Sequence, residues 1–227
     1  MRNKVAILVQ GNYALFTRPE QKVERVTYDV ITPSAARGIV EAIYWHPQIT
    51  WVIDRIHVLR PIKTMSIQRN EVKEKANANS NKVREYYIED KHTPRSSLIL
   101  QDVAYIIEAH FELNLEKIDY KEINNQKDIE EEMEKHFNIF KRRAKKGECY
   151  HRPYLGCREF DCYFEWMQPK DFPKSDIADT KEGNQDLGMM LFDINFENPK
   201  DLKARFFRAR IDNGIIDLTR LQQKEQR

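Results

Sequence analysis

Three side chains on two separated segments are suited to acid–base chemistry on a phosphate ester. Tyr44 ends the apolar stretch EAIY, and Lys135 and His136 stand side by side much later in the chain. A phenol and an imidazole can exchange protons, and an ammonium group can balance negative charge on a phosphate. Together they would suit the attack of an RNA 2′-hydroxyl on its own adjacent phosphate, a reaction that needs no metal ion.

Each of these residues also has a simpler explanation. A lone histidine on such a helix is more often a surface residue, and aromatic residues at a helix end more often pack there. We give no chemical role to the neighbours of Tyr44. Trp45 is expected to pack at the corner between helix and strand, and His46 to lie on the surface before Pro47. The chemistry therefore depends on whether the fold brings the two segments together.

The first third of the chain alternates between strand and helix patterns. Residues 4–9, KVAILV, are almost continuously apolar, as in a central strand. Residues 32–46 have the period of a helix, with Thr32 as its N-cap and Pro47 preventing its continuation. A second strand is predicted over residues 49–59, ITWVIDRIHVL.

The middle of the chain first loses this order and then regains it. Residues 61–100 are rich in Asn, Lys, Arg and Glu, which predicts an exposed insertion such as a mobile hairpin. Alternation returns over residues 103–113, a strand on whose polar face His110 is expected to be solvated. Residues 128–148 are the clearest helix, and residues 157–166 alternate as a further strand.

The order β-α-β, insertion, β-α-β predicts an α+β fold of the ferredoxin-like βαββαβ type, with both helices on one face of an antiparallel sheet. In that fold the end of the first helix approaches the middle of the second, which would bring Tyr44 to Lys135 and His136. Further strands are predicted after Trp166, with a hairpin turn at Asn213-Gly214. We therefore predict a first domain over residues 1–168, with the insertion at about 61–100, and a small antiparallel β-sheet domain over residues 169–227.

The overall composition excludes several classes of protein. The 227 residues are 41% hydrophobic and 33% charged, which is typical of a globular protein. The net charge is only +2, so any binding of an anion must come from local clusters of basic residues. The chain has no GxxxxGK[ST], GxGxxG, GxSxG or HExxH motif. No stretch has the length of a membrane span, and the apolar run near the N-terminus is too short for a signal-peptide core. We expect no cofactor.

The cysteines indicate reduced thiols rather than a disulfide or metal site. Cys149, Cys157 and Cys162 are odd in number and form no CxxC pair, which favours a cytoplasmic protein. A zinc site that includes His151 is disfavoured because no ligand pair has the usual tight spacing.

Two basic stretches are candidates for RNA contact, and each has a competing explanation. The KRRAKK stretch ends the second helix after an acidic start, which also complements the helix dipole. In FFRAR, Phe206, Arg208 and Arg210 share one strand face, which suits stacking and phosphate binding or simple solvation. The candidate RNA-binding residues are Arg37, Lys141, Arg142, Arg143, Arg208 and Arg210.

Four stretches resemble the CRISPR-associated Cas-five family of subtype I-C, also called Dvulg, in the RAMP superfamily. They are GNYALFTRPE, TPSAARGIVEAIYW, the isolated KH and YLGCREF. The resemblance implies a ferredoxin-like, RRM-related domain followed by a small β-sheet domain. It also implies a metal-independent endoribonuclease that cuts precursor CRISPR RNA at the base of each repeat hairpin and stays on the 5′ handle within the antiviral interference complex, with Tyr44, Lys135 and His136 as catalytic residues.

Three hypotheses follow. In the first, an endoribonuclease that is a monomer when isolated, His136 is general base or acid, Lys135 stabilises charge on the phosphate, and Tyr44 orients or deprotonates the 2′-hydroxyl. In the second, the protein caps the 5′ end of the guide RNA without cutting, as related proteins of other subtypes do. In the third, it is a protein-interaction module with no RNA function.

Overall fold

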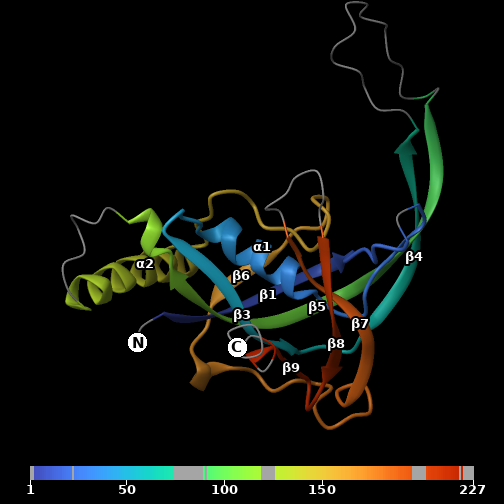
Figure 1. Ribbon diagram of the computed structural model, residues 1–227. Helices are drawn as coiled ribbons and strands as arrows, with labels where there is room; N and C mark the ends of the chain where they lie inside the picture. Colours follow the sequence, from blue (N-terminus) through green and yellow to red (C-terminus); the bar gives the residue numbers. More distant parts are fainter. Residues whose placement is uncertain are drawn as a thin grey trace, which may run out of the picture.

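The computed structural model contains an antiparallel sheet crossed on one face by two helices (Figure 1). The strands of the predicted βαββαβ order are β1 (Lys4–Ala14), β3 (Ile49–Val58), β5 (His92–Leu113) and β6 (Tyr163–Trp166). They are arranged β6-β1-β5-β3, and each neighbouring pair is antiparallel. The predicted ferredoxin-like α+β fold is therefore confirmed. The structure describes residues 3–21, 23–73, 89, 91–118, 126–195, 203–219 and 221.

The first helix, α1 (Pro33–Ile43), begins as its sequence predicts and ends earlier. The Thr32 hydroxyl accepts a hydrogen bond from the Ala35 amide at 3.2 Å, and proline occupies the first turn. The expected end at residue 46 is wrong, because Tyr44 already has an extended backbone, with φ −152° and ψ 116°. Its carbonyl instead accepts a hydrogen bond from the Trp51 indole at 2.8 Å, which joins the end of α1 to β3.

The second helix, α2 (Gln126–Lys146), begins two residues before its predicted range of 128–148 and ends before Gly147, which has a φ of +68°. Phe140 and Ala144 of its apolar stripe are fully buried against the core that α1 also covers. The predicted residues of the buried face of α1, Ala36, Ile39, Val40 and Ile43, are all buried, and Pro33 and Ala42 are buried with them.

A β-bulge in β3 switches the side chains that face this core. Ile49, Trp51 and Ile53 point to the core before the bulge, and Ile56 and Val58 after it. The extra residue is Asp54, whose carboxylate accepts a hydrogen bond from His110 Nδ1 at 2.9 Å. The expectation of a solvated His110 is therefore wrong.

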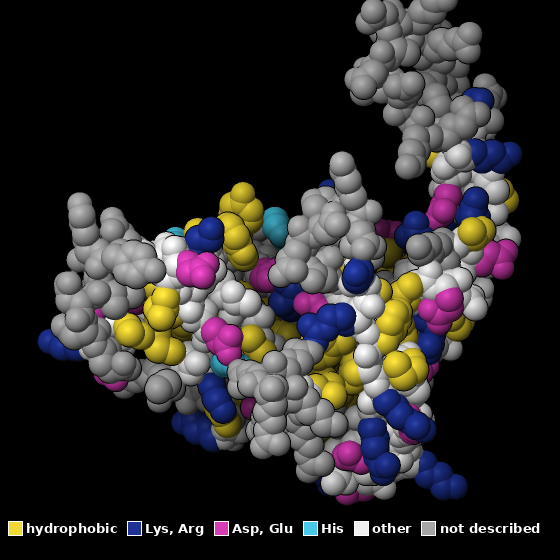
Figure 2. Space-filling view, viewed as in Figure 1, with side chains coloured by type: hydrophobic (Ala, Val, Ile, Leu, Met, Phe, Trp, Pro, Cys, Tyr) yellow, Lys and Arg dark blue, Asp and Glu magenta, His cyan; other side chains and the backbone are white. Residues whose placement is uncertain are grey.

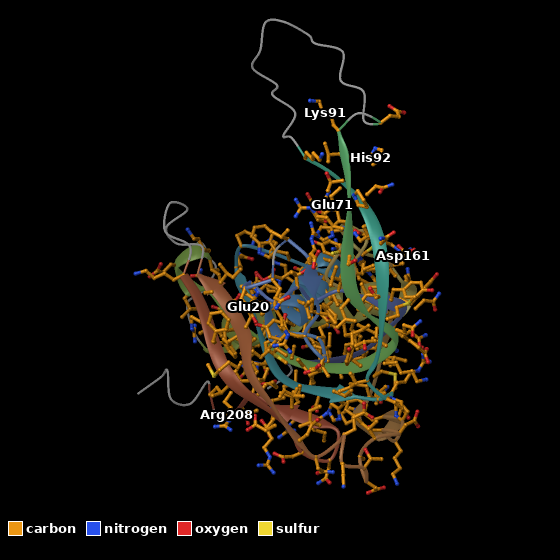
Figure 3. All side chains as sticks on the ribbon, turned by 90° about the vertical axis from the view of Figure 1, so that its right-hand side faces the viewer. Glu20, Glu71, Lys91, His92, Asp161 and Arg208 are labelled. Carbon is orange, nitrogen blue, oxygen red and sulfur yellow. The ribbon has the colours of Figure 1, made fainter. Side chains whose placement is uncertain are left out.

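Much of the predicted insertion is regular structure. Strand β4 (Lys63–Val72) pairs with the first half of β5 and forms an arm that leaves the body of the protein (Figures 1 and 3). The short strand β2 (Arg25–Val26) pairs with the same half of β5. Residues 92–102 are thus part of a strand, and Glu71 of β4 forms ion pairs with Arg25 of β2 and Arg95 of β5. The rest of the insertion, residues 74–88 and 90, lies outside the described residues.

Strand β6 is also shorter than the range of residues 157–166 predicted for it. Residues before Tyr163 form a turn that is closed by a bridge between Tyr154 and Asp161. Gly156 in this turn has a φ of +85°, and a side chain there would collide with the Leu15 carbonyl.

The C-terminal third adds a second sheet and one strand to the first. Strands β7 (Gln185–Asn195) and β8 (Lys203–Ile211) form a two-stranded sheet that packs on α1. The Asn213-Gly214 turn, with φ values of 52° and 79°, is the predicted hairpin turn and leads into β9 (Ile215–Asp217). Because β9 pairs with β3, the chain returns to the main sheet, and a domain boundary at residue 168 stays a prediction.

Two short 3₁₀ helices, η2 (Leu115–Lys117) and η3 (Pro169–Asp171), lie in connections between these elements. In the described ranges, no helix combines the length and apolar character that crossing a membrane requires.

Candidate active site

Tyr44 and His136 meet inside the protein. The Tyr44 hydroxyl lies 2.7 Å from His136 Nδ1, a hydrogen bond between the end of α1 and the middle of α2. Both residues are buried, with 6% of Tyr44 and 1% of His136 exposed. The expectation of a surface histidine is therefore wrong, and the fold brings the two segments together as its topology predicts. Their catalytic role stays a prediction.

Burial moves the pKa values of the two groups apart. Desolvation lowers the pKa of His136 to about 4, with smaller contributions of the same sign from His46 and Lys135 and an opposing one from Glu132. Desolvation raises the pKa of Tyr44, against the nearby Arg143 cation. At neutral pH the pair therefore consists of a neutral imidazole and a protonated phenol.

The two ring nitrogens of His136 have different surroundings. Nδ1 is held by Tyr44, whereas Nε2 is buried and has no hydrogen-bond partner among the described residues. The ring packs edge-on against Phe111, with 6.2 Å between ring centroids. The contacts with Tyr44 and Phe111 fix the orientation of the ring.

Lys135 is on the same helix but does not touch Tyr44 or His136. Its side chain is 57% exposed, and its ammonium donates to Glu132 at 2.7 Å. Glu132 is one helical turn before His136 and mostly buried, so its carboxylate holds the lysine beside the histidine. Sequence reasoning missed Glu132, although its spacing of four residues from His136 was visible in the sequence.

His46 is the second residue that sequence reasoning missed. Its ring centroid lies 5.1 Å from that of His136, and its ring stacks with Tyr44 at 6.5 Å. It is half-buried, so the expectation of a surface residue is wrong. Residues two apart on extended backbone point to the same side, and this rule would have placed His46 beside Tyr44.

Trp45 is 59% exposed rather than packed at the corner between helix and strand, which corrects the prediction. The corner is filled instead by Trp51, which packs against Phe111 and Phe140.

The predicted RNA-binding residues of α2 have different surroundings. Arg143 donates to the Ile43 carbonyl at 3.0 Å and lies over the Tyr44 ring at 5.1 Å, so it links the two helices. Lys141 lies over the rings of Phe137 and Trp166, and Arg142 is exposed.

The other predicted contacts are paired with carboxylates. Arg37 bonds to Glu41 at 2.9 Å and to Asp193 at 2.7 Å. Arg208 and Arg210 share an exposed face of β8 as predicted, where they pair with Asp186 and Asp212 respectively. Figure 2 shows Lys and Arg interspersed with Asp and Glu on the visible face. In Figure 3, Arg208 points outward at the end of the molecule opposite the arm. RNA binding by these residues stays a prediction.

The protein combines a ferredoxin-like domain with a buried tyrosine–histidine pair between its two helices, which fits an RNA-processing protein. Comparison of the sequence with known protein families identifies the family. A family model described as CRISPR-associated protein (Cas_Cas5) matches residues 5–219, so the chain belongs to this family. It is 44% identical over 228 residues to the CRISPR pre-crRNA endoribonuclease Cas5d of Mannheimia succiniciproducens, across 96% of each chain. It is 41% identical to the CRISPR pre-crRNA endoribonuclease Cas5d of Thermus thermophilus, across 86% of this chain and 76% of that one.

Two solved structures share the fold. One is described as a CRISPR-associated protein, with a TM-score of 0.67 and 26% identity across 94% of this chain and 90% of that one. The other is the functionally uncharacterized protein SMU1763c from Streptococcus mutans, with a TM-score of 0.65 and 24% identity across 94% of this chain and 91% of that one.

Proposed function

We propose that this protein is an endoribonuclease that cuts precursor CRISPR RNA within its repeats by attack of a 2′-hydroxyl on the adjacent phosphate. The observation that carries the proposal is the 2.7 Å contact between Tyr44 and His136, with a free Nε2. The names of its two curated relatives supply the substrate class.

The reaction forms a bond between the 2′-oxygen and phosphorus and breaks the bond from phosphorus to the 5′-oxygen. One product ends in a 2′,3′-cyclic phosphate and the other begins with a 5′-hydroxyl. A base must take the 2′ proton, a cation must balance the added charge on the phosphate, and a proton must reach the leaving 5′-oxygen.

The neutral His136 is the general base in this proposal. To take the proton at Nε2, its Nδ1 must carry hydrogen and donate it to the Tyr44 oxygen. An anionic phosphate nearby raises the pKa of the histidine and so strengthens it as a base. Because the pKa of Tyr44 is raised, the phenol stays protonated and holds the imidazole rather than deprotonating the RNA. Lys135, exposed beside this pair, faces the phosphate.

The alternative is a subunit that binds the 5′ handle of the guide RNA and does not cut. The near-complete burial of His136 favours it, since the imidazole reaches RNA only when the side chains that cover it yield. In both cases we place the protein with other subunits of a type I-C interference complex. We also propose a cytoplasmic location, for which the three unpaired cysteines are suitable.

The test is incubation of the protein with repeat RNA in excess EDTA. We expect one cut per repeat, products with a 2′,3′-cyclic phosphate, and a loss of roughly 10²- to 10⁴-fold in rate for His136→Ala. Tight binding with uncut RNA would support the handle-binding subunit. A requirement for divalent metal would overturn the mechanism.

A further inference from the structure

A groove beside the Tyr44–His136 pair has the features of a site for unpaired nucleobases. It has a volume of about 940 Å³ and lies between α1, residues 45–47 and the loop of residues 150–156, with β7 along one side. His46 lines the groove and its ring is 5.1 Å from that of His136, so the proposed catalytic histidine lies directly behind a residue of the groove wall.

The rim of the groove carries exposed aromatic side chains. Trp45 is 59% exposed and Tyr150 is 81% exposed, and Tyr154 is partly exposed on the same rim. Exposed apolar side chains that gather at one place on the surface mark a site of interaction or a ligand-binding groove. Flat rings that line a groove are the usual platforms on which single-stranded bases stack, because every base has an aromatic face.

One of the residues that line the groove is a glycine inside a helix. Gly38 lies within α1 and lines the groove, and among the described residues no atom outside the local helix lies within 4 Å of the position a Cβ would take. Packing therefore does not require glycine here, although glycine within a helix costs about 0.5–1 kcal/mol relative to alanine. A glycine without a packing reason is expected where a ligand approaches the backbone closely.

The charges of the groove suit bases rather than phosphates. Arg37 bonds to Glu41 and Asp193, so this ion-pair cluster has one cation and two carboxylates. A phosphate would meet net negative charge here. The edges of bases carry both donors and acceptors, which the guanidinium and carboxylates can match.

We propose that this groove binds the unpaired nucleotide or nucleotides next to the scissile bond, with their bases stacked on Trp45 and Tyr150 over Gly38. The site thereby helps to hold the RNA strand in line with His136. The proposal rests on the proposed action on RNA, and it assigns to Arg37 a contact with base edges instead of phosphate.

The test uses a short unstructured RNA that carries one 2-aminopurine, whose fluorescence is quenched when it stacks. We expect quenching by the wild-type protein and affinity lower by about 5- to 150-fold in Trp45→Ala and Tyr150→Ala, as for the loss of one stacked base. Trp45→Phe should retain most of the affinity. Tyr163→Ala is the matched control, because Tyr163 is exposed but does not line the groove.

Gly38→Leu provides an independent variant, because a Cβ at this position meets no described atom outside the local helix, leucine favours helix, and its side chain would occupy space in the groove. It should keep the melting temperature and lose RNA affinity, whereas Gly38→Ala should be more stable. On repeat RNA, Trp45→Ala should lower kcat/KM, through a higher KM and through a lower kcat where the strand is no longer held in line with His136.

Equal quenching in all four proteins would overturn the proposal that the groove binds bases, and a protein partner would then be the remaining candidate ligand. The four proteins are the wild type, Trp45→Ala, Tyr150→Ala and Gly38→Leu. That result is compatible with cleavage of repeat RNA by the wild type. A wild type that quenches the probe but leaves repeat RNA uncut would overturn only the nuclease activity, so the two failures are distinguishable.

Discussion

In mild acid the protein should lose stability, and His136 should cause a large part of this loss. The variant His136→Gln should therefore lose less stability than the wild type when the pH is lowered. Burial lowers the pKa of this histidine from 6.5 to about 4, so between these values the unfolded chain binds a proton that the folded protein does not. Stability must then fall as the pH decreases below 6.5, and it falls no further below about 4. At 1.36 kcal/mol per pH unit, the whole contribution is at most about 3.4 kcal/mol, of which about 2 kcal/mol lies between pH 7 and pH 5.

The assay is urea unfolding of wild type and His136→Gln at about pH 7, 6 and 5. Glutamine keeps a hydrogen-bond partner for Tyr44. His110 acts in the opposite direction, since Asp54 raises its pKa and its contribution is lost as the pH rises, but it is the same in both proteins and cancels in the difference. We expect the wild type to lose about 2 kcal/mol more than the variant between pH 7 and pH 5. Equal losses in the two proteins would refute a buried neutral His136.

Three further substitutions separate the roles of the site. Tyr44→Phe should lower kcat by roughly 10²-fold and shift the pH dependence of kcat, because Nδ1 of His136 loses its hydrogen-bond partner. An unchanged pH dependence would contradict the role of Tyr44 in holding His136. Lys135→Ala should reduce kcat while the melting temperature stays within about 1 °C, since the side chain is exposed, and a large thermal loss would count against this. Arg143→Ala should cost about 1–2 kcal/mol in urea unfolding, because it removes the contacts to the α1 end, whereas Arg142→Ala, the matched control, should cost little.

The fold was predictable because its elements carry strong local signals. Helix α2 has an apolar stripe and a glycine end, and the Asn213-Gly214 turn has the backbone that its sequence demands. The arm of β4 and β5 was not predictable from periodicity, since no side chain of β4 is buried and its Glu71 forms a cross-strand ion pair with Arg95.

The site was predictable only in part. The topology brought Tyr44 to His136, but it did not show how deeply the histidine is buried, which depends on packing against Phe111 and His46. The prediction had Trp45 packed and His46 on the surface, whereas Trp45 is exposed and His46 is half-buried. The reason is that the helix ends at Ile43 and the backbone of Tyr44 is extended, which changes the side chain that faces inward.

In the proposed reaction, the RNA supplies its own nucleophile to the site of Tyr44 and His136. The most direct measurement replaces the single nucleotide before the mapped cut with its 2′-deoxy form and follows cleavage in EDTA. We expect this RNA to bind with unchanged affinity and to stay uncut, while a 2′-deoxy group one nucleotide further away leaves cleavage intact. Full cleavage of the RNA that lacks the 2′-hydroxyl at the cut site would exclude this reaction.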